Sequence, residues 1–150
     1  MIVSPGRPDP QVLRRHLLAL SRAVANLERH RGTTAEQLAA DPDLAWAIER
    51  GLQLCAQNAI DLATHLAVSS GRDVPDYAAA IDALAELGIV PAEFASTFRG
   101  IAGFRNVLVH GYLDVDLTVV SRLLDTGLGD FTEFARLIER FLEKDRTERS

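Results

Sequence analysis

Apolar residues recur at steps of three and four along nearly the whole chain, which is the spacing of one face of an α-helix. The first stripe predicts a helix over residues 11–30, which Gly32 ends. Its members are Val12, Leu13, Leu17, Leu20, Val24 and Leu27. Thr34 and Gln37 then stand three residues apart, as in a capping box, and predict a short helix to about residue 40.

A second stripe predicts the longest helix. Asp41 is a good N-cap, Pro42 suits the first helical position, and the Ser-Ser-Gly run at 69–71 ends the pattern. The apolar positions are Ala45, Ile48, Leu52, Cys55, Ala59, Leu62 and Leu66. Gly51 costs this helix about 1 kcal/mol relative to alanine. We therefore expect a close helix crossing at Gly51.

The next two helices begin at clear N-terminal signals. Asp76 caps a helix over 77–87, which Gly88 ends. Pro91 opens a helix that we expect to run without a break to Gly111. Its pattern includes Phe94, Phe98, Ile101, Ala102, Arg105 and Val109.

Two helices complete the pattern. Asp116 can cap a helix over 117–124, and Asp130 can cap a last one. The core side of the last helix carries Phe131, Phe134, Ile138, Phe141 and Leu142. Evidence for strands is almost absent. The sequence therefore predicts an all-α fold, an up-and-down four-helix bundle with additional short helices.

Length and composition fit one domain over residues 1–150, with 1–9 and 144–150 expected to be flexible. Apolar residues make up 47% and charged residues 25%, close to an average globular chain. The single cysteine, Cys55, cannot form an intramolecular disulfide. No apolar run reaches the roughly 18 residues that span a bilayer, and the N-terminus lacks the apolar core of a signal peptide. We expect a soluble, cytoplasmic protein without a membrane partner.

The formal net charge of −5 argues against a broad polyanion-binding face. Residues 99–113 nevertheless carry Arg99 and Arg105 and no acidic side chain. Any contact with nucleic acid should therefore be local and centred on a small basic site.

Several familiar chemistries are missing. The chain has no glycine-rich phosphate loop, no cysteine pair for zinc and no Glu-x-x-His pair for a di-iron bundle site. The sequence therefore indicates no metal and no organic cofactor. His16 and His30 are expected to be solvated, whereas Asp61 and His65, at i and i+4, favour a structural hydrogen bond.

His110, unlike the other histidines, has several polar residues close to it in the sequence. It follows Arg105 and Asn106 and precedes Tyr112 at the end of an otherwise apolar helix. Arg105 and His110 are five residues apart, about 140° around an ideal helix, and so do not converge on one straight helix. Either the helix winds irregularly, or a second subunit completes a site. The structural alternative is a histidine at the helix dipole and an arginine paired with an acid.

The spacing Arg105-x4-His110-x-Tyr112 resembles the signature of HEPN-domain ribonuclease toxins of the HepT type, in which a polar residue usually follows the arginine, as Asn106 does here. Residues 57–65 and 104–117 are similar to the family as well, and the likeness covers roughly residues 10–143.

The resemblance implies the toxin of a type VII-like toxin–antitoxin system. Such a protein would be a homodimer whose two motifs meet in a cleft, and a metal-independent endoribonuclease with tRNA as one candidate substrate. His110 would move protons as the ribose 2′-hydroxyl attacks, Arg105 would hold the phosphate, and Asn106 would position the phosphate or the histidine. The product would be a 2′,3′-cyclic phosphate.

The resemblance also implies a partner. A cognate MNT-type nucleotidyltransferase antitoxin would bind, in a complex that can be a higher hetero-oligomer, and would transfer AMP to Tyr112. The added negative charge would face Arg105 and block the substrate phosphate.

Two other functions compete. The chain could be a non-catalytic helical partner subunit of a nucleotidyltransferase, with Arg105 and His110 serving only the interface. It could also be a helical bundle that binds a nucleotide or small molecule, although no further feature of the sequence supports this.

Overall fold

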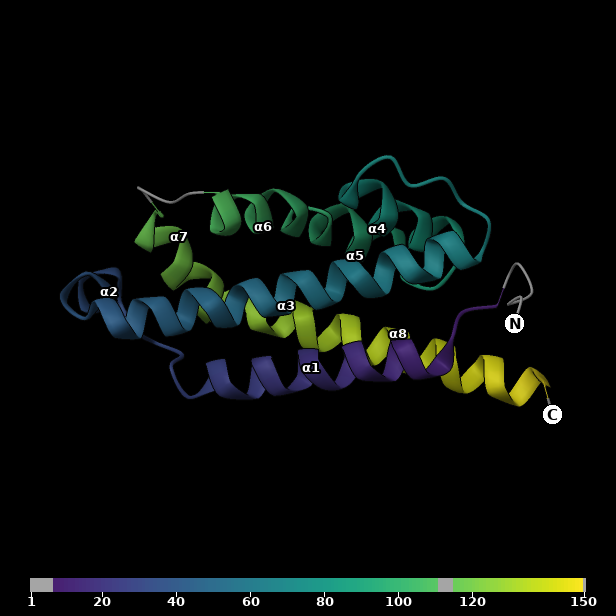
Figure 1. Cartoon of the computed structure of the whole chain (residues 1–150), viewed down its shortest axis with the longest axis horizontal. Coiled ribbons are helices and arrows are strands. Elements are labelled where there is room, and N and C mark those ends of the chain that lie inside the picture. Colours follow the sequence, from purple (N-terminus) through teal and green to yellow (C-terminus); the bar gives the residue numbers. More distant parts are fainter. Residues whose placement is uncertain (1–6, 111–114, 150) are drawn as a thin grey trace.

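The computed structural model describes residues 7–110 and 115–149, with only the backbone of 107–110 and 149, and all its regular elements are helical (Figure 1). In chain order they are α1 (Pro10–Glu28), α2 (Ala35–Ala40), α3 (Pro42–Ser69), α4 (Tyr77–Glu86), α5 (Ala92–Phe98), α6 (Ile101–His110), α7 (Leu117–Arg122), a π-helical segment (Leu123–Gly127) and α8 (Leu128–Arg149). The predicted all-α fold is confirmed.

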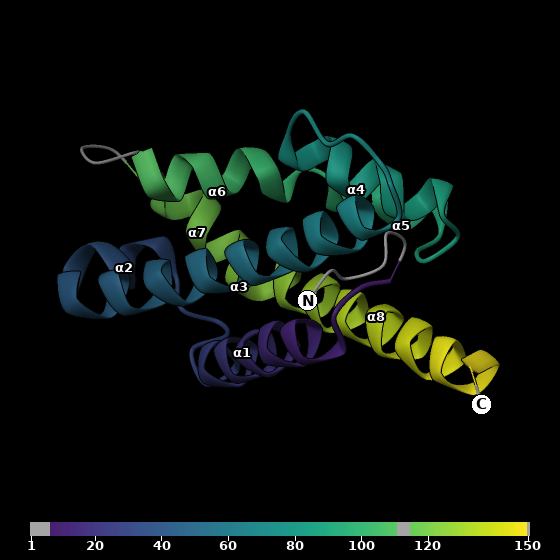
Figure 2. The ribbon, with the colours of Figure 1, turned by 45° about the vertical axis from the view of Figure 1, so that its right-hand side comes forward.

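The long helix α3 is the centre of the molecule. It packs against α1 and α8 on one side and against α4 and α6 on the other (Figures 1 and 2). The apolar stripe predicted for α3 is buried along its whole length, from Ala45 to Leu66. The chemistry-bearing helix α6 is therefore fixed in place mainly by α3.

The predicted helix starts are confirmed where a side chain caps the backbone. Thr34 and Gln37 form the reciprocal capping box of α2. Asp41 accepts a hydrogen bond from the Leu44 N–H at the start of α3, and Asp76 accepts one from the Ala79 N–H at the start of α4.

Gly51 lies at a close crossing of α1 and α3, as predicted. A Cβ at this position would stand 2.7 Å from Cδ2 and 2.9 Å from Cγ of Leu27, whose side chain is buried. The missing side chain lets the two helices approach, which accounts for a glycine inside a long helix.

The prediction of one unbroken helix from Pro91 to Gly111 is wrong, because the chain forms two helices, α5 and α6. The break lies at Arg99 and Gly100, where the Gly100 N–H reaches back only three residues, to the Thr97 carbonyl at 3.3 Å. Glycine has low helix propensity and tolerates this tight turn. Phe98, at the end of α5, is anchored by stacking on Phe134 of α8, with ring centroids 4.7 Å apart.

The predicted cap at Asp130 is also wrong. Asp130 lies within α8, which begins at Leu128 and follows α7 through the π-helical segment without a loop. Leu124, Gly127 and Leu128 are buried, so packing keeps this stretch helical. Helix α8 continues through the charged residues after Lys144 to Arg149, and the flexibility of 1–9 and 144–150 stays a prediction.

Candidate active site

Arg105, Asn106 and His110 of the predicted motif lie on α6, which runs alongside α3 in the opposite direction and ends over the N-terminal half of α3 (Figures 1 and 2). Arg105 lies at the middle of α6 and His110 is its last residue. Arg105 therefore lies on the face of the bundle formed by α3, α4 and α6.

Arg105 reaches across to α3. Its Nε donates a hydrogen bond to Oε1 of Gln57 at 2.9 Å. Gln57 in turn donates from Nε2 to Oδ1 of Asp61, one turn further along α3, at 2.8 Å. Because Asp61 accepts from the amide nitrogen of Gln57, the amide oxygen of Gln57 faces the arginine.

Two further contacts hold the guanidinium. Its central carbon lies 5.3 Å from the ring centroid of Tyr77, the first residue of α4, within cation–π range. Nη1 makes a long contact of 3.5 Å with Oδ1 of Asn106, whose side chain is exposed. Among the described residues, no carboxylate forms an ion pair with Arg105. The terminal nitrogens therefore have no short hydrogen bond within this part of the chain and can take a planar oxyanion.

The structure settles one alternative about the angular gap between Arg105 and His110. Helix α6 is α-helical from Ile101 to His110, so the irregular winding considered from the sequence does not occur in this range. The two residues thus remain about 140° apart around the helix. Tyr112, the expected site of AMP transfer, lies outside the described residues.

The other histidines lie at the contact of α1 and α3. His16 is not fully solvated as expected, because it is half-buried and its Nδ1 lies 2.9 Å from Oδ1 of Asn58. The expected hydrogen bond between Asp61 and His65 is wrong as well. Asp61 bonds to Gln57 on the α6 side, while Nε2 of His65 accepts from the backbone N–H of Asp9 at 3.0 Å.

The surroundings of His65 change its acidity. Burial lowers the pKa of His65 from its ordinary value of 6.5, the neighbouring His16 lowers it further, and Asp9 acts in the opposite direction. A neutral His65 is the form that can accept the hydrogen bond from Asp9. His65 therefore has a structural role in holding the start of α1.

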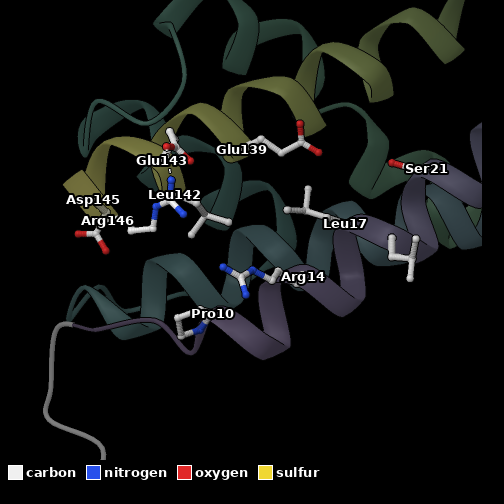
Figure 3. Close-up of a pocket in the computed structure, with 10 residues that line it drawn as sticks. Pro10, Arg14, Leu17, Ser21, Glu139, Leu142, Glu143, Asp145 and Arg146 are labelled. Atoms are coloured by element: carbon white, nitrogen blue, oxygen red, sulfur yellow. Dashed lines mark hydrogen bonds and ion pairs between the residues drawn. The ribbon is translucent and has the colours of Figure 1, made fainter. Parts of the chain in front are cut away.

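A cavity of about 480 Å³ lies elsewhere, between the N-terminal part of α1 and the C-terminal part of α8 (Figure 3). Its lining includes Arg14 and Leu17 from α1 and Leu142 and Arg146 from α8, and no residue of α6. Arg146 is paired there with Glu143 at 2.6 Å. This cavity belongs to a different face and takes no part in the candidate site.

The described ranges offer neither a metal site nor a membrane-spanning helix. In residues 7–110 and 115–149, no three His, Cys, Asp or Glu side chains are grouped so that they could hold a metal ion. None of the helices in the same ranges is both long and apolar enough to cross a membrane.

Comparison with known proteins places this chain in a family. The model of the family described as "Ribonuclease HepT-like" matches residues 20–138, which include α3, α6 and the whole motif. The chain belongs to the HepT-like ribonuclease family. The resemblance seen at Arg105, His110 and Tyr112 is therefore confirmed at the level of the family.

Two relatives illustrate the HepT-like family. The chain is 26% identical over 136 residues to the tRNA nuclease HepT of Aphanizomenon flos-aquae, covering 89% of this chain and 92% of that relative. It is 23% identical over 124 residues to the mRNA nuclease HepT of Shewanella oneidensis, covering 82% of this chain and 92% of that one. The matches run nearly the full length of both nucleases.

A solved structure shares the fold. The tri-AMPylated HEPN toxin of Shewanella oneidensis, in complex with MNT antitoxin, superposes with a TM-score of 0.77 at 21% identity. The match covers 88% of this chain and 99% of that toxin. The bundle seen here is thus the HEPN fold of the HepT-like family.

Sequence reasoning found Arg105 but missed what holds it. Gln57 and Asp61 stand at i and i+4 on α3, a spacing that signals a pair on one helix face, yet nothing in the sequence points from Gln57 to Arg105. Tyr77 gave no signal, because it follows an ordinary N-cap at Asp76.

Proposed function

We propose that this protein is the toxin of a type VII-like toxin–antitoxin system and a metal-independent endoribonuclease. In this proposal residues 1–150 act as one HEPN domain in the cytoplasm. Membership of the HepT-like family and the likeness to two HepT nucleases support the activity. The two relatives are named for different RNAs, so tRNA is one candidate substrate and mRNA another.

One observation carries the proposal: Arg105 is oriented by two residues and neutralised by none of those described. Gln57 holds Nε and Tyr77 covers the guanidinium face, while no acid pairs with the charge. An arginine fixed in orientation, with its terminal nitrogens available, suits a phosphate.

The chemistry follows from the residue types. Neutral His110 removes the proton of a ribose 2′-hydroxyl, whose oxygen attacks the adjacent phosphorus, and the bond to the leaving 5′-oxygen breaks. A protonated histidine supplies the proton that this leaving oxygen needs. Arg105 stabilises the charge on the phosphate oxygens in the transition state, and Asn106 positions the phosphate or the histidine. The products are a 2′,3′-cyclic phosphate and a free 5′-hydroxyl.

The proposal includes a homodimer. Arg105 and His110 occupy positions about 140° apart around one regular helix, so we infer that a single chain does not bring them together on one phosphate. Two copies related by a two-fold axis can place the arginine of one protomer near the histidine of the other. The dimer also supplies one histidine as base and one as acid.

The proposed partner is an MNT-type nucleotidyltransferase antitoxin, in a complex that can be a higher hetero-oligomer. The structural likeness to a tri-AMPylated toxin bound to such an antitoxin supports this partner. We further propose that the antitoxin transfers AMP to Tyr112, two residues after His110. The added phosphate would compete with RNA for Arg105.

The experiment compares purified wild type with His110→Ala and Arg105→Ala, using total tRNA and a mixed mRNA pool in EDTA. Cleavage by the wild type and loss in both variants, with the helical circular dichroism unchanged, is the expected result. His30→Ala is the matched control, since His30 lies in the turn after α1, beside residues of α1 and α3 and none of α6. An oligonucleotide with a single 2′-deoxy substitution should resist cleavage at that site.

Two results would overturn the proposal. A folded His110→Ala variant that cleaves as well as the wild type removes the histidine from the chemistry. A wild type that cleaves neither RNA pool, with an intact mass showing no added AMP, leaves the chain as a non-catalytic partner of a nucleotidyltransferase. Binding to the antitoxin that depends on Arg105 would then identify that alternative.

A further inference from the structure

Trp46, the only tryptophan of the chain, lies in the open on α3. Its side chain is 77% exposed, more than any other large apolar residue in the described ranges. An exposed indole forgoes the favourable free energy that its large apolar surface would contribute if it were buried. A tryptophan held in this way on a rigid helix is typical of a recognition surface.

Trp46 stands on the same side of α3 as the residue that holds Arg105. Positions 46, 50, 53 and 57 are spaced by four, three and four residues, so Trp46, Arg50, Gln53 and Gln57 share one helix face. The eleven steps along the helix from Trp46 to Gln57 span about 16 Å along its axis. Helix α6 ends with His110 over this half of α3 (Figure 2). Trp46 and the Gln57 side chain that holds Arg105 therefore lie on one continuous face of α3.

The surface beside Trp46 contains a cavity, which we call the Trp46 hollow. This cavity of about 340 Å³ is lined by Trp46, Glu49, Arg50 and Gln53 of α3 and by Val115, five residues after His110. Arg50 forms no ion pair with any residue in the described part of the chain. The hollow therefore combines a flat aromatic surface, a carboxylate, an amide and an uncompensated cation within two turns of α3.

This combination matches a nucleotide better than a protein. Unstacked bases of single-stranded RNA stack on aromatic rings and bond through their Watson–Crick edges. Glu49 accepts hydrogen bonds, Gln53 both donates and accepts, and Arg50 attracts a phosphate. The buried centre of a protein interface is instead depleted of charge, and covering Glu49 and Arg50 there would leave two charges to compensate.

We propose that this hollow binds one base of the RNA substrate next to the cleaved phosphate. Trp46 stacks on the base, Glu49 and Gln53 contact its Watson–Crick edge, and Arg50 holds the adjoining phosphate. Guanine fits best, because its N1–H and exocyclic amino group offer two neighbouring donors to one carboxylate. The inference rests on the proposed RNA-cleaving function and adds a specificity-determining subsite to it.

The first test measures binding directly. Because Trp46 is the only tryptophan, its fluorescence reports on this subsite alone. Wild-type protein is titrated with short 2′-O-methyl oligoribonucleotides, which cannot be cleaved, each with one guanine, adenine, cytosine or uracil in a fixed context. Saturable quenching is expected, strongest for guanine, with Glu49→Gln reducing the preference for guanine. Binding without any change in fluorescence overturns the subsite.

The second test measures cleavage. Trp46→Ala should raise KM about tenfold with kcat unchanged, in keeping with the loss of one base–aromatic stack. Trp46→Phe should recover most of the affinity because phenylalanine still stacks. Leu18→Ala removes another exposed apolar side chain, on α1, and should leave KM unchanged.

The outcomes separate this inference from the proposed function. Cleavage by wild type with equal KM in Trp46→Ala overturns the subsite and leaves the nuclease intact. Absence of cleavage by wild type overturns the nuclease, while the fluorescence titration still decides the subsite. If Trp46→Ala instead changes the oligomeric state by light scattering and RNA causes no quenching, Trp46 is a contact between protein chains and the proposal fails.

Discussion

Gln57 accepts a hydrogen bond from Nε of Arg105 at 2.9 Å and thereby joins α3 to α6. The bond has a fixed direction, because Asp61 accepts from the Gln57 amide nitrogen and leaves the oxygen for the arginine. Asp61 is linked to Arg105 through this amide and forms no direct ion pair with it. The guanidinium is thus oriented without being neutralised, which keeps its attraction for a phosphate.

We expect Gln57→Ala to lower kcat for RNA cleavage by about tenfold or more, with a small change in KM. One hydrogen bond to a charged group contributes about 1.5–3 kcal/mol, and 1.4 kcal/mol corresponds to a factor of ten in rate. The loss should fall on kcat because the bond fixes the direction of Arg105 in the transition state. Steady-state kinetics on one fluorogenic RNA measures both constants.

Asn58→Ala is the matched control for Gln57→Ala. Asn58 is the next residue on α3 but faces α1, where it contacts His16. Its removal should leave kcat within about twofold of wild type. Equal losses in the two variants would mean that both act through the stability of α3, and Gln57 would have no positioning role.

The helix starts could be predicted from the sequence because their signals are local. Thr34 with Gln37, Asp41 with Pro42, and Asp76 each satisfy backbone N–H groups within three residues, so no knowledge of the fold is needed. The junctions between consecutive helices could not be predicted in this way. The break near Gly100 and the continuous passage through Leu124 depend on how neighbouring helices pack.

The same distinction between local signals and long-range packing applies to the residues of the candidate site. Arg105 and His110 can be proposed from the sequence because the motif is contiguous and resembles the family signature. Gln57 is 48 residues away from Arg105, and Tyr77 is on a third helix, so only the packing of α3, α4 and α6 brings them together. Trp46 lies outside the apolar stripe of α3 that forms the core. The sequence alone does not show that its side chain is exposed, which is seen only in the fold.

Cys55 should be inert in the folded protein. Its side chain is fully buried in α3, and burial raises the pKa of the thiol to about 12. Only the thiolate reacts, so Ellman's reagent at pH 8 should label no cysteine in native buffer and one equivalent in urea. Labelling within minutes in native buffer would contradict this and indicate local opening of α3.

Stability should fall in mild acid through His65. Its pKa is lowered in the folded state, so the unfolded chain takes up a proton first as pH falls through 6.5. The folded state therefore loses stability below pH 6.5, and the loss levels off below the folded pKa. Thermal unfolding from pH 7.5 to 5 should show a smaller decrease in Tm for His65→Gln than for wild type. Parallel profiles for the two proteins would exclude this contribution.

The crossing at Gly51 can be tested by a double-mutant cycle. Gly51→Ala brings a Cβ to 2.7 Å from Cδ2 of Leu27, and overpacking of this kind costs about 1–3 kcal/mol. The gain in helix propensity offsets about 1 kcal/mol of this cost, so we expect a net loss of about 1 kcal/mol in urea unfolding.

In the Leu27→Ala background the clash is absent, and the same Gly51→Ala change should stabilise the protein by about 1 kcal/mol. The sign of the effect thus depends on Leu27 alone. Leu13 lies on the same face of α1 and is also buried, so Gly51→Ala in a Leu13→Ala background is the matched control and should remain destabilising. A stabilising Gly51→Ala in otherwise wild-type protein would show that α1 and α3 lie further apart at this crossing than 2.7 Å implies.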